Sequence, residues 1–458
     1  MEYRYRDASE MKDSGVEWIG KIPKDWEIKR NKYMFSEINL KNSKHDDNLL
    51  SVSEYYGVAL RRDKMSDNEY LTRAESLEDY KVCKEDDLVM NIMLAWKKAM
   101  GVSRYDGIVS PAYCIYRKKD IISMKYYHYL FRTDLYASLF KQNSTGIIDS
   151  RLRLYPEKFL SIYSHRPKLE TQMKIAKFLD KKTSQFDSII SKKEALIEKL
   201  EEAKKSLISE VVTGKVKVVK TDDGYDLVKR SSDEMKDSGV DWIGCIPKGF
   251  KIVRLGLISF VTKLAGFEYT NNMAEALSNE GEVPIVRAGN IKMNKFINQE
   301  KEFIDIETSK LLNRSALYQK CVLITFIGAG IGEVALFDKV ERHHLAPNVA
   351  KIEILGENKN KIDEQYLIYY LMSSAGQEEV NKIKKASAQP SLSMETIRNM
   401  KIVIPELDEQ YKINEYLTKR IKEIEHIIDK TKKQIEKLKE AKQSLISEAV
   451  TGKIEIMD

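Results

Sequence analysis

The chain has 458 residues, of which 42% are hydrophobic and 32% charged, and its formal net charge is +7. This apolar share suffices for ordinary folded cores, so wholesale disorder is excluded, and the length indicates roughly two to four domains. No run approaches about 18 consecutive apolar residues, and the start of the chain lacks an apolar segment, so we expect no membrane partner and no secretory signal.

A short sequence near the start of the chain, which we call the cap, is repeated 224 residues later. Met11–Gly20 recurs as Met235–Gly244 with nine of ten positions identical, and Ile22-Pro23 recurs as Ile246-Pro247. Such a repeat indicates two copies of one architectural unit, which predicts an internal pseudo-two-fold symmetry.

Two dissimilar stretches, 24–167 and 248–405, follow the two caps, and we call them the first and second heads. They carry net charges of +5 and +3, so most of the positive excess lies in them. Gene duplication followed by drift is the simpler alternative, but drift would not preserve the ends while changing the middle. We interpret the pattern as one task performed on two different targets.

Residues 168–212 and 406–450 are predicted to be long helices, since neither contains Pro or Gly and both are rich in strong helix formers. Each prediction ends just before a Thr-Gly pair, at Gly214 and Gly452, where glycine is a natural stop. Apolar residues recur in both with coiled-coil spacing. The predicted seam consists of Phe186, Ile190, Ile197, Leu200, Leu207, Ile424, Ile428, Ile435, Leu438 and Leu445.

Such helices would be about 65 Å long, and an exposed apolar stripe of that length is unfavourable. Two of them in one chain can bury each other, so we predict an antiparallel coiled coil that holds the heads apart. Lys193 and Thr431 fall near the seam and weaken it locally. The alternative, in which each helix packs on its own head, agrees less well with the heptad spacing.

A search for catalytic motifs finds none that holds. Gly328–Gly332 lacks the GxGxxG spacing and is better explained as a tight turn between strands. His343-His344 has no further ligand nearby, Glu27-Ile-Lys29 is a chance fragment of a nuclease motif, and the four cysteines lack CxxC spacing. We therefore expect no enzyme activity, no cofactor bound by this chain, and a reducing, cytoplasmic location.

Basic and polar clusters in the heads are candidates for DNA binding, because Lys and Arg contact phosphates while Arg, Asn and Gln read base edges. For any single cluster a solvated surface remains the simpler explanation. The candidates are Arg61, Arg62, Lys97, Lys98, Asn143, Arg151 and Arg153 in the first head, and Arg287, Asn290, Lys292, Arg342, His343, Lys384, Gln389 and Ser391 in the second.

The doubled organisation resembles the specificity subunit of a type I restriction–modification system. The resemblance rests on the repeated caps and on the two helix entries, Pro167–Gln172 and Pro405–Gln410. It also rests on the repeated helix exits that end at Gly214 and Gly452, which belong to an 18-residue match with 15 identities. In the second head, Gly289–Ile291 and Ile331-Gly332 also resemble family features.

The resemblance implies an α+β protein with two mixed α/β target-recognition domains separated by two long helices in an antiparallel coiled coil. Each domain would read one half of a split, asymmetric site in double-stranded DNA. Two methyltransferase subunits carrying S-adenosylmethionine and restriction/translocase subunits using ATP and Mg²⁺ would be its partners. The expected divisions are 1–167, 168–215, 216–247, 248–405, 406–453 and 454–458.

The helix-proximal alignment at an offset of 238 places Arg151 opposite Gln389 and Arg153 opposite Ser391. Further from the helix, Met90–Ile92 is a partial counterpart of Gly289–Ile291. Two other functions stay open: a coiled-coil scaffold whose heads bind proteins, and a complete restriction enzyme with its own nuclease. Salt-sensitive DNA binding and a cleavage assay on the pure chain would distinguish them.

Overall fold

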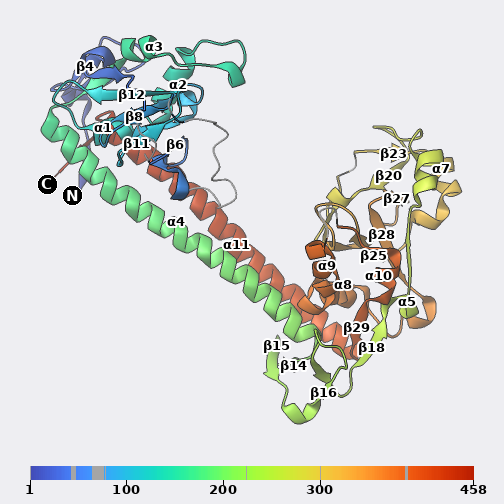
Figure 1. Ribbon diagram of the computed structural model, residues 1–458. Helices are drawn as coiled ribbons and strands as arrows, with labels where there is room; N and C mark the ends of the chain where they lie inside the picture. The colour runs from blue at the N-terminus through green and yellow to red at the C-terminus, as the bar shows by residue number, and fades with distance from the viewer. Residues whose placement is uncertain are drawn as a thin grey trace. The chain divides into compact units, whose positions relative to one another are not determined.

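The computed structural model describes residues 2–42, 48–63, 77, 79–222, 224–299, 301–386 and 390–457. The chain divides into two compact units, the first formed by Met1–Glu194 with Lys432–Asp458 and the second by Ala195–Thr431. Each unit contains one head and a segment of both long helices (Figure 1). In the described residues, no helix combines the length and the apolar character needed to cross a membrane.

The first unit is built on a four-stranded antiparallel sheet in the order β10-β9-β12-β5, flanked by short strand pairs and three short helices. Its strands are β1 Tyr3–Tyr5, β2 Met11–Asp13, β3 Lys21–Pro23, β4 Glu27–Arg30, β5 Phe35–Ile38, β6 Leu50–Ser53, β7 Gly57–Leu60, β8 Lys81–Cys83, β9 Leu88–Asn91, β10 Met100–Val102, β11 Gly107–Val109, β12 Tyr113–Lys118, β13 Tyr163–Arg166 and β30 Ile454–Ile456. Its short helices are α1 Met124–Leu130, α2 Asp134–Gln142 and α3 Pro156–Ser161.

The second unit has a matching sheet in the order β19-β28-β25-β26 and a second sheet, β23-β20-β27-β24, in which β20 and β27 are parallel. Its strands are β14 Val216–Thr221, β15 Gly224–Lys229, β16 Met235–Asp237, β17 Cys245–Pro247, β18 Lys251–Arg254, β19 Ser259–Lys263, β20 Val283–Val286, β21 Ile291–Lys292, β22 Lys295–Phe296, β23 Phe303–Ile304, β24 Ala316–Leu317, β25 Cys321–Thr325, β26 Val334–Phe337, β27 His343–Leu345, β28 Val349–Ile354 and β29 Lys401–Ile404. Its short helices are α5 Leu255–Ile258, α6 Gly266–Glu268, α7 Ile306–Leu311, α8 Glu364–Met372, α9 Ser374–Ala386 and α10 Met394–Asn399.

The two heads share one strand register, although their sequences look unrelated. In the first head Met90 on β9 pairs with Met100 on β10, and in the second Ile324 on β25 pairs with Val334 on β26. Both residues of the second pair are displaced by 234 positions from the first. The central sheets are therefore superimposable element by element, β5 on β19, β9 on β25, β10 on β26 and β12 on β28.

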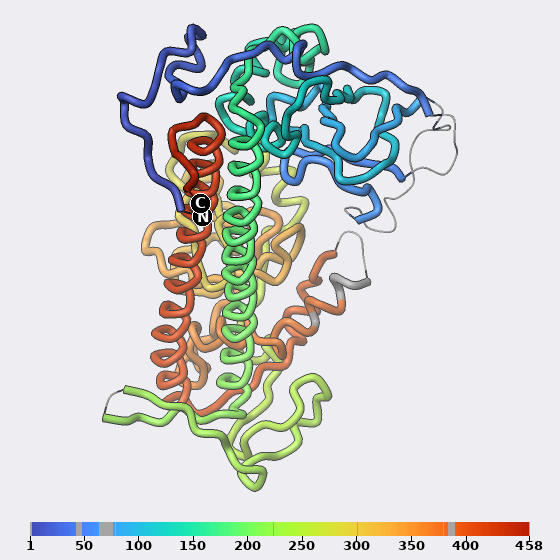
Figure 2. Tube along the Cα trace, turned by 90° about the vertical axis from the view of Figure 1, so that its left-hand side faces the viewer, coloured from blue at the N-terminus to red at the C-terminus, as the bar shows by residue number. Residues whose placement is uncertain are grey.

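The predicted long helices are confirmed as α4, Leu169–Val212, and α11, Leu407–Val450. They pack side by side and antiparallel in each unit (Figures 1 and 2), as cross-helix contacts show. In the first unit the Lys193 Nζ donates to Gln434 Oε1 at 2.7 Å. In the second, the Lys204 Nζ lies 3.5 Å from a carboxylate oxygen of Glu425.

All ten predicted seam residues are buried or half-buried, and Ile190, Ile428 and Ile435 are less than a tenth exposed. Thr431 is also buried, and its hydroxyl donates to the backbone carbonyl of Ile427. The seam therefore tolerates a threonine by satisfying its hydroxyl within the helix.

Two lysines outside the seam form matched ion pairs across the long helices, which the sequence pattern did not reveal. Lys442 Nζ lies 2.6 Å from Asp187, and Lys204 Nζ lies 3.5 Å from Glu425. Adding 238 converts Lys204 into Lys442 and Asp187 into Glu425, so the two pairs are symmetry equivalents. Their equivalence indicates that both halves of the coiled coil share one register.

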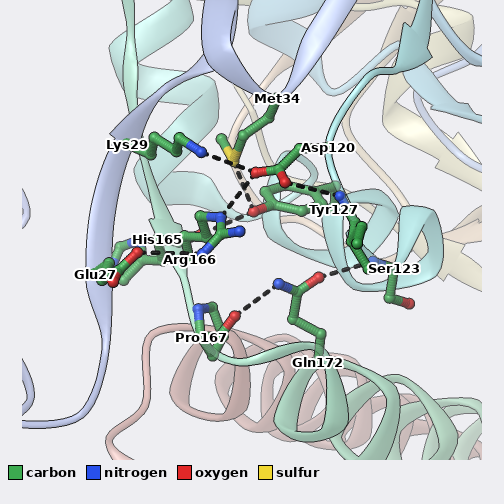
Figure 3. Close-up of polar contacts among 11 residues, drawn as sticks. Glu27, Lys29, Met34, Asp120, Ser123, Tyr127, His165, Arg166, Pro167 and Gln172 are labelled. Carbon is green, nitrogen blue, oxygen red and sulfur yellow. Dashed lines mark hydrogen bonds and ion pairs between the residues drawn. The ribbon is translucent and has the colours of Figure 1, made fainter.

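A buried glutamine fastens the start of each long helix to its head, and Figure 3 shows the first of them, Gln172. The Gln172 side chain accepts from the Ser123 N–H and donates to the Pro167 carbonyl, both at 2.8 Å. Gln410 makes the equivalent bonds, to the N–H of residue 363 and to the carbonyl of Pro405, both at 2.9 Å. These contacts give a physical reason for the repetition of the helix entry.

A buried tyrosine fastens each head to the end of the other long helix. The Tyr126 hydroxyl of α1 donates to the carbonyl of Val450, at the end of α11, at 2.7 Å. The Tyr366 hydroxyl of α8 donates to the carbonyl of Val212, at the end of α4, at 3.1 Å. Each head is thus held by the beginning of one long helix and the end of the other.

The strands beside the caps repeat the same pairing in two ways. β14 and β15 form a hairpin in the middle of the chain, in which Val216 lies opposite Lys229. β30 and β1 make the equivalent pairing from opposite ends of the chain, with Ile454 opposite Tyr5. In Figure 2 the chain ends marked N and C lie side by side.

Candidate nucleic-acid interface

In the first head, the turn between β9 and β10 carries an aromatic ring between two lysines. The turn contains a short 3₁₀ helix, Ala95–Lys97. The indole N–H of Trp96 donates to the Met93 carbonyl at 3.1 Å, which fixes the ring. Lys97 Nζ and Lys141 Nζ lie 5.1 and 4.8 Å from the ring centroid, within cation–π range.

Surface hollows border Trp96 on two sides. One, of about 420 Å³, is also lined by Tyr55, Lys98 and Lys141. The other, of about 500 Å³, is lined by Lys97 and by residues 149 and 150 of a neighbouring loop. The hollows also contain acids, since Lys98 pairs with Asp134 at 2.6 Å and Lys141 pairs with Asp149 at 2.9 Å. An aromatic ring beside lysines is a combination that binds bases and phosphates together.

The neighbouring loop, residues 143–153, holds three of the predicted DNA contacts. Arg151 is exposed, and Arg153 pairs with Thr145 across the base of the loop. Asn143 uses its amide to donate to the Leu139 carbonyl at 2.9 Å, so it caps α2. The Leu154 N–H donates to the Ile92 carbonyl, which joins the loop to the turn after β9.

The second head places its glycine-rich segment at the position of the Trp96 turn. Gly328–Gly332 connects β25 to β26, so the prediction of a tight turn between strands is confirmed. Gly332 has a φ of +84°, and a Cβ there would lie 2.7 Å from Val380, so no other residue fits without strain. The Leu392 N–H donates to the Phe326 carbonyl, as Leu154 does to Ile92 in the first head.

The proposed likeness of Met90–Ile92 to Gly289–Ile291 is wrong. Strand register aligns Asn91 on β9 with Thr325 on β25, and Gly289–Ile291 instead follows β20. Leu49 pairs in parallel with Ile108, and residue 285 pairs in parallel with residue 344 in the same way. The counterpart of Gly289–Ile291 is therefore the turn 53–55, and the sequence missed it because no residue is shared.

Three predicted contacts of the second head cluster around Gly289–Ile291. Asn290 is buried, and its amide donates to the carbonyls of Ile297 and Gln299 at 2.9 and 3.0 Å. Both of its side-chain N–H groups are bonded inside the head, so Asn290 supports the turn and does not offer these donors to a base. Arg287 pairs with Glu302, and Lys292 lies 3.2 Å from Glu333 in the Gly328–Gly332 region.

Arg342 and His343 lie elsewhere in the second head: Arg342 directly precedes β27, and His343 is its first residue. The Arg342 guanidinium donates to the Ser309 hydroxyl at 2.7 Å and to Asn313 at 2.9 Å, which ties it to the α7 region. His343 is buried at 4% exposure. Among the described side chains, no group of three or more His, Cys, Asp or Glu residues could hold a metal ion.

The remaining predicted contacts are spread over both heads. Arg61 and Arg62 lie on a 3₁₀ helix after β7, and Arg62 lies 3.8 Å from Asp63. Lys98 Nζ pairs with Asp134 at 2.6 Å. Ser391 is exposed, and its backbone pairs with that of Ile327 beside the glycine-rich turn.

Two predicted residues cannot be placed. Gln389 lies outside the described residues, and so does the side chain of Lys384, whose backbone belongs to α9. Their contribution to the interface stays a prediction.

The fragment Glu27-Ile-Lys29 forms structural ion pairs (Figure 3). The Asp120 carboxylate accepts from Lys29 Nζ and from Arg166 Nε, both at 3.0 Å, and Arg166 also pairs with Glu27 at 3.1 Å. Burial alone would raise the pKa of Asp120, but these hydrogen bonds outweigh it and lower the pKa to about 2. The cluster fastens β4 to β13 beside the start of α4.

Sequence reasoning missed the residues that hold the turns in place. Arg132, between α1 and α2, donates to five backbone carbonyls of two turns. In the second head, Gln377 of α9 donates to the carbonyl of Gly332 at 3.0 Å. No local pattern marks either residue, because their partners are backbone atoms far away in the sequence.

Comparison with known proteins supports the family resemblance. Residues 247–437 match the model of the type I restriction modification DNA specificity domain. The chain is 24% identical over 451 residues to the type I restriction enzyme MjaVIII specificity subunit of Methanocaldococcus jannaschii, which covers 95% of this chain and 94% of that protein.

Two solved structures share the fold. One is a chain from a structure concerned with complex assembly and conformational transition of the type I R-M system, with a TM-score of 0.64 and 13% identity. The match covers 94% of this chain and 98% of that one. The HsdS subunit from Thermoanaerobacter tengcongensis gives a TM-score of 0.51 and 14% identity, with 96% and 99% covered. The chain is thus similar along nearly its whole length to specificity subunits of type I restriction enzymes, and residues 247–437 match the model of the DNA specificity domain.

Proposed function

We propose that this chain is the DNA-recognition subunit of a type I restriction–modification complex and that it reads a split, asymmetric site in double-stranded DNA. Each head reads one half-site, and the chain itself performs no chemistry. The observation that carries the proposal is the contrast between shared frame and different turns: identical strand register presents Trp96 and lysines in one head and glycines in the other.

The surface of the first head supports a nucleic-acid ligand. Lys97, Lys141 and Arg151 gather around Trp96 and its neighbouring loop. Cations supply sequence-independent affinity for phosphates, while arginine and aromatic groups contribute to the choice of bases. The second head offers Lys292 and Ser391 around its own turn.

In this proposal the repeated caps and helices are docking surfaces for partner subunits. The coiled coil is a ruler, which means that its length fixes the distance between the two half-sites. Two methyltransferase subunits bind the repeated caps and helices and bring S-adenosylmethionine, and restriction/translocase subunits bring ATP and Mg²⁺. The coiled coil sets the number of base pairs between the half-sites. The complex works in the cytoplasm, where the DNA is.

Methylation mapping tests this function directly. The genome of the host is sequenced for modified bases with and without an intact copy of this gene. The proposal expects one bipartite motif that disappears with the gene, and persistence of every methylated motif would contradict it.

A scaffold with two protein-binding heads is the alternative, and DNA binding separates the two. The purified chain should bind duplex DNA with an affinity that falls steeply as salt rises, because bound cations release counterions from DNA. Binding that is absent at low salt would favour the scaffold.

A further inference from the structure

We propose that Arg132 is the positioning residue of the first head's reading surface, because one guanidinium fixes both turns that correspond to the glycine elements of the second head. This inference rests on the proposed DNA-reading function. It assigns the specificity of the first half-site to a side chain that itself touches no base.

The geometry of Arg132 is that of a clamp. Its Nη1 donates to the carbonyls of Lys98 and Met100, both at 2.8 Å, and more weakly to that of Ser53 at 3.4 Å. Its Nη2 donates to the carbonyls of Glu54 and Tyr55, both at 3.0 Å. The planar, forked shape of the guanidinium lets one side chain hold two separate backbone segments at once.

Burying the Arg132 guanidinium costs folding free energy. Burial lowers the pKa of Arg132 to about 10, so the group stays protonated at neutral pH. Among the described residues no carboxylate pairs with it. Its hydrogen bonds to backbone carbonyls replace the hydration of the cation only in part, so the buried guanidinium adds little to the stability of the head. Its effect is to fix the positions of the two turns.

The two clamped turns carry the outward-facing groups of the surface. The first, 53–55, ends in Tyr55, which is 83% exposed. The second precedes Met100 and carries Trp96 and Lys97, and the 420 Å³ hollow beside Trp96 is lined by Tyr55 and Lys98 from both turns. Movement of either turn would change the shape of this hollow.

The second head holds the equivalent turns by different means. Gln377 donates to the carbonyls of Gly332 and Leu371 at 3.0 and 2.7 Å. The ion pair between Lys292 and Glu333 joins the strand after Gly289–Ile291 to the glycine-rich turn. Each head therefore has its own clamp at the same place in the fold, and no substitution in one clamp touches the other.

The test exploits this separation. Chromosomal variants Arg132→Lys and Gln377→Leu are made in the native host, and the methylated motif of each is mapped. Lysine keeps the charge but cannot reach both turns with a planar fork. Arg117→Lys is the matched control, since Arg117 belongs to the same head but pairs with Asp87 at 2.7 Å, away from the turns.

For Arg132→Lys we expect discrimination at one or more positions of the first half-site to fall by about tenfold, with the second half-site and the gap unchanged. Gln377→Leu should loosen the second half-site alone, and Arg117→Lys should leave the motif intact. A purely structural role would lower the amount of methylation over the whole site without changing which bases are preferred.

Tyr55→Ala keeps the inference falsifiable if Arg132→Lys fails to accumulate, because its side chain is mostly in solvent and its loss should not unfold the head. It too should loosen only the first half-site. An unchanged motif in both Arg132→Lys and Tyr55→Ala, or equal loosening of both half-sites, overturns the inference. A wild-type host without any bipartite motif overturns the proposed function instead.

Discussion

The two heads fill one backbone framework with different core side chains at several matched positions. In the first, aromatic rings occupy the centre, among them Tyr116 of β12, Phe131 after α1 and Phe159 of α3, all fully buried. Strand and helix register places Ile352, Leu371 and Ile397 at the corresponding positions of the second head, also buried. Cores of such different shape with one register show that strand pairing and the repeated frame, more than particular core residues, define this fold.

The same contrast continues at the surface. A tryptophan and lysines line one turn, and glycines line its counterpart, while the glutamine and tyrosine contacts to the long helices are the same in both units. Contacts that join a head to the frame are repeated, and side chains that face outward from the turns are not. The heads thus differ where targets would differ and agree where partners would be shared.

Shortening the coiled coil should have the largest effect on recognition, because it changes the distance between the heads and leaves the DNA-reading turns of both heads unaltered. Deleting 192–198 from α4 and 430–436 from α11 removes one heptad from each helix and keeps the Asp187–Lys442 and Lys204–Glu425 pairs. The helices shorten by about 10 Å, which corresponds to about three base pairs at ~3.4 Å each.

Methylation mapping should then show the same half-site bases with a gap shorter by about three base pairs and no modification of the original site. A deletion of one heptad from α4 alone is the control, since it misaligns the seam and should abolish modification. An unchanged gap in the double deletion would refute the ruler.

Acid should destabilise the first head more than the second. Burial lowers the pKa of His128 to about 3 and that of His165 to about 4, whereas the second head has one such group, His344, whose pKa burial also lowers. His128 and His165 are both neutral when folded. Below about pH 6.5 these histidines become protonated in the unfolded chain but stay neutral in the folded head. The free energy of unfolding therefore falls as the pH decreases from neutral toward 4.

The loss amounts to at most about 1.4 kcal/mol per pH unit for each histidine. Hydrogen exchange followed by mass spectrometry at pH 7 and pH 5 resolves the two heads separately. Equal changes in protection would contradict the assigned burial of these groups.

Removing the buried glutamine of either unit should weaken that unit. Gln172→Leu removes the side-chain partner of two backbone groups, and Gln410→Leu that of three, because Gln410 also donates to the Lys361 carbonyl at 2.7 Å. Each substitution should cost about 2–3 kcal/mol or more. Calorimetry should give a fall in Tm for both variants, at least as large for Gln410→Leu as for Gln172→Leu. A smaller fall for Gln410→Leu would show that the equivalent contacts are not energetically equivalent.

Exchanging the residues at one matched position should have the smallest effect, and it concerns recognition alone. Arg151→Gln with Gln389→Arg should change base preference in both half-sites, by about 1–3 kcal/mol for a bidentate contact. Methylation sequencing of the variant measures the change. Unchanged half-sites would remove both positions from the readout.

Sequence alone predicted the frame well, for physical reasons. Nearly identical caps and heptad spacing are local or repeated signals, so both long helices, their antiparallel pairing and the burial or half-burial of the ten expected seam residues could be predicted. The ion pairs of Lys204 and Lys442 were missed because an antiparallel register is needed to see which acid faces which lysine.

The surface of the heads was predictable only in part. Lys97 and Arg151 were identified from local charge, and the structure places the Lys97 turn beside the loop that carries Arg151. The match of Met90–Ile92 to Gly289–Ile291 was wrong because it was based on residue identity. The structural counterpart, 53–55, follows from the parallel pairing of Leu49 with Ile108. Arg132 and Gln377 act through backbone carbonyls, which leave no trace in a sequence.

The pairing of β30 with β1 has a topological consequence. It reproduces the hairpin of β14 and β15, except that a covalent turn joins one pair and none joins the other. Joining β30 to β1 would therefore make the two pairings alike in connection as well as in register. A circular permutant, cut in the turn between Thr221 and Gly224 and closed by a short linker between β30 and β1, should keep every strand partner and fold to the same structure.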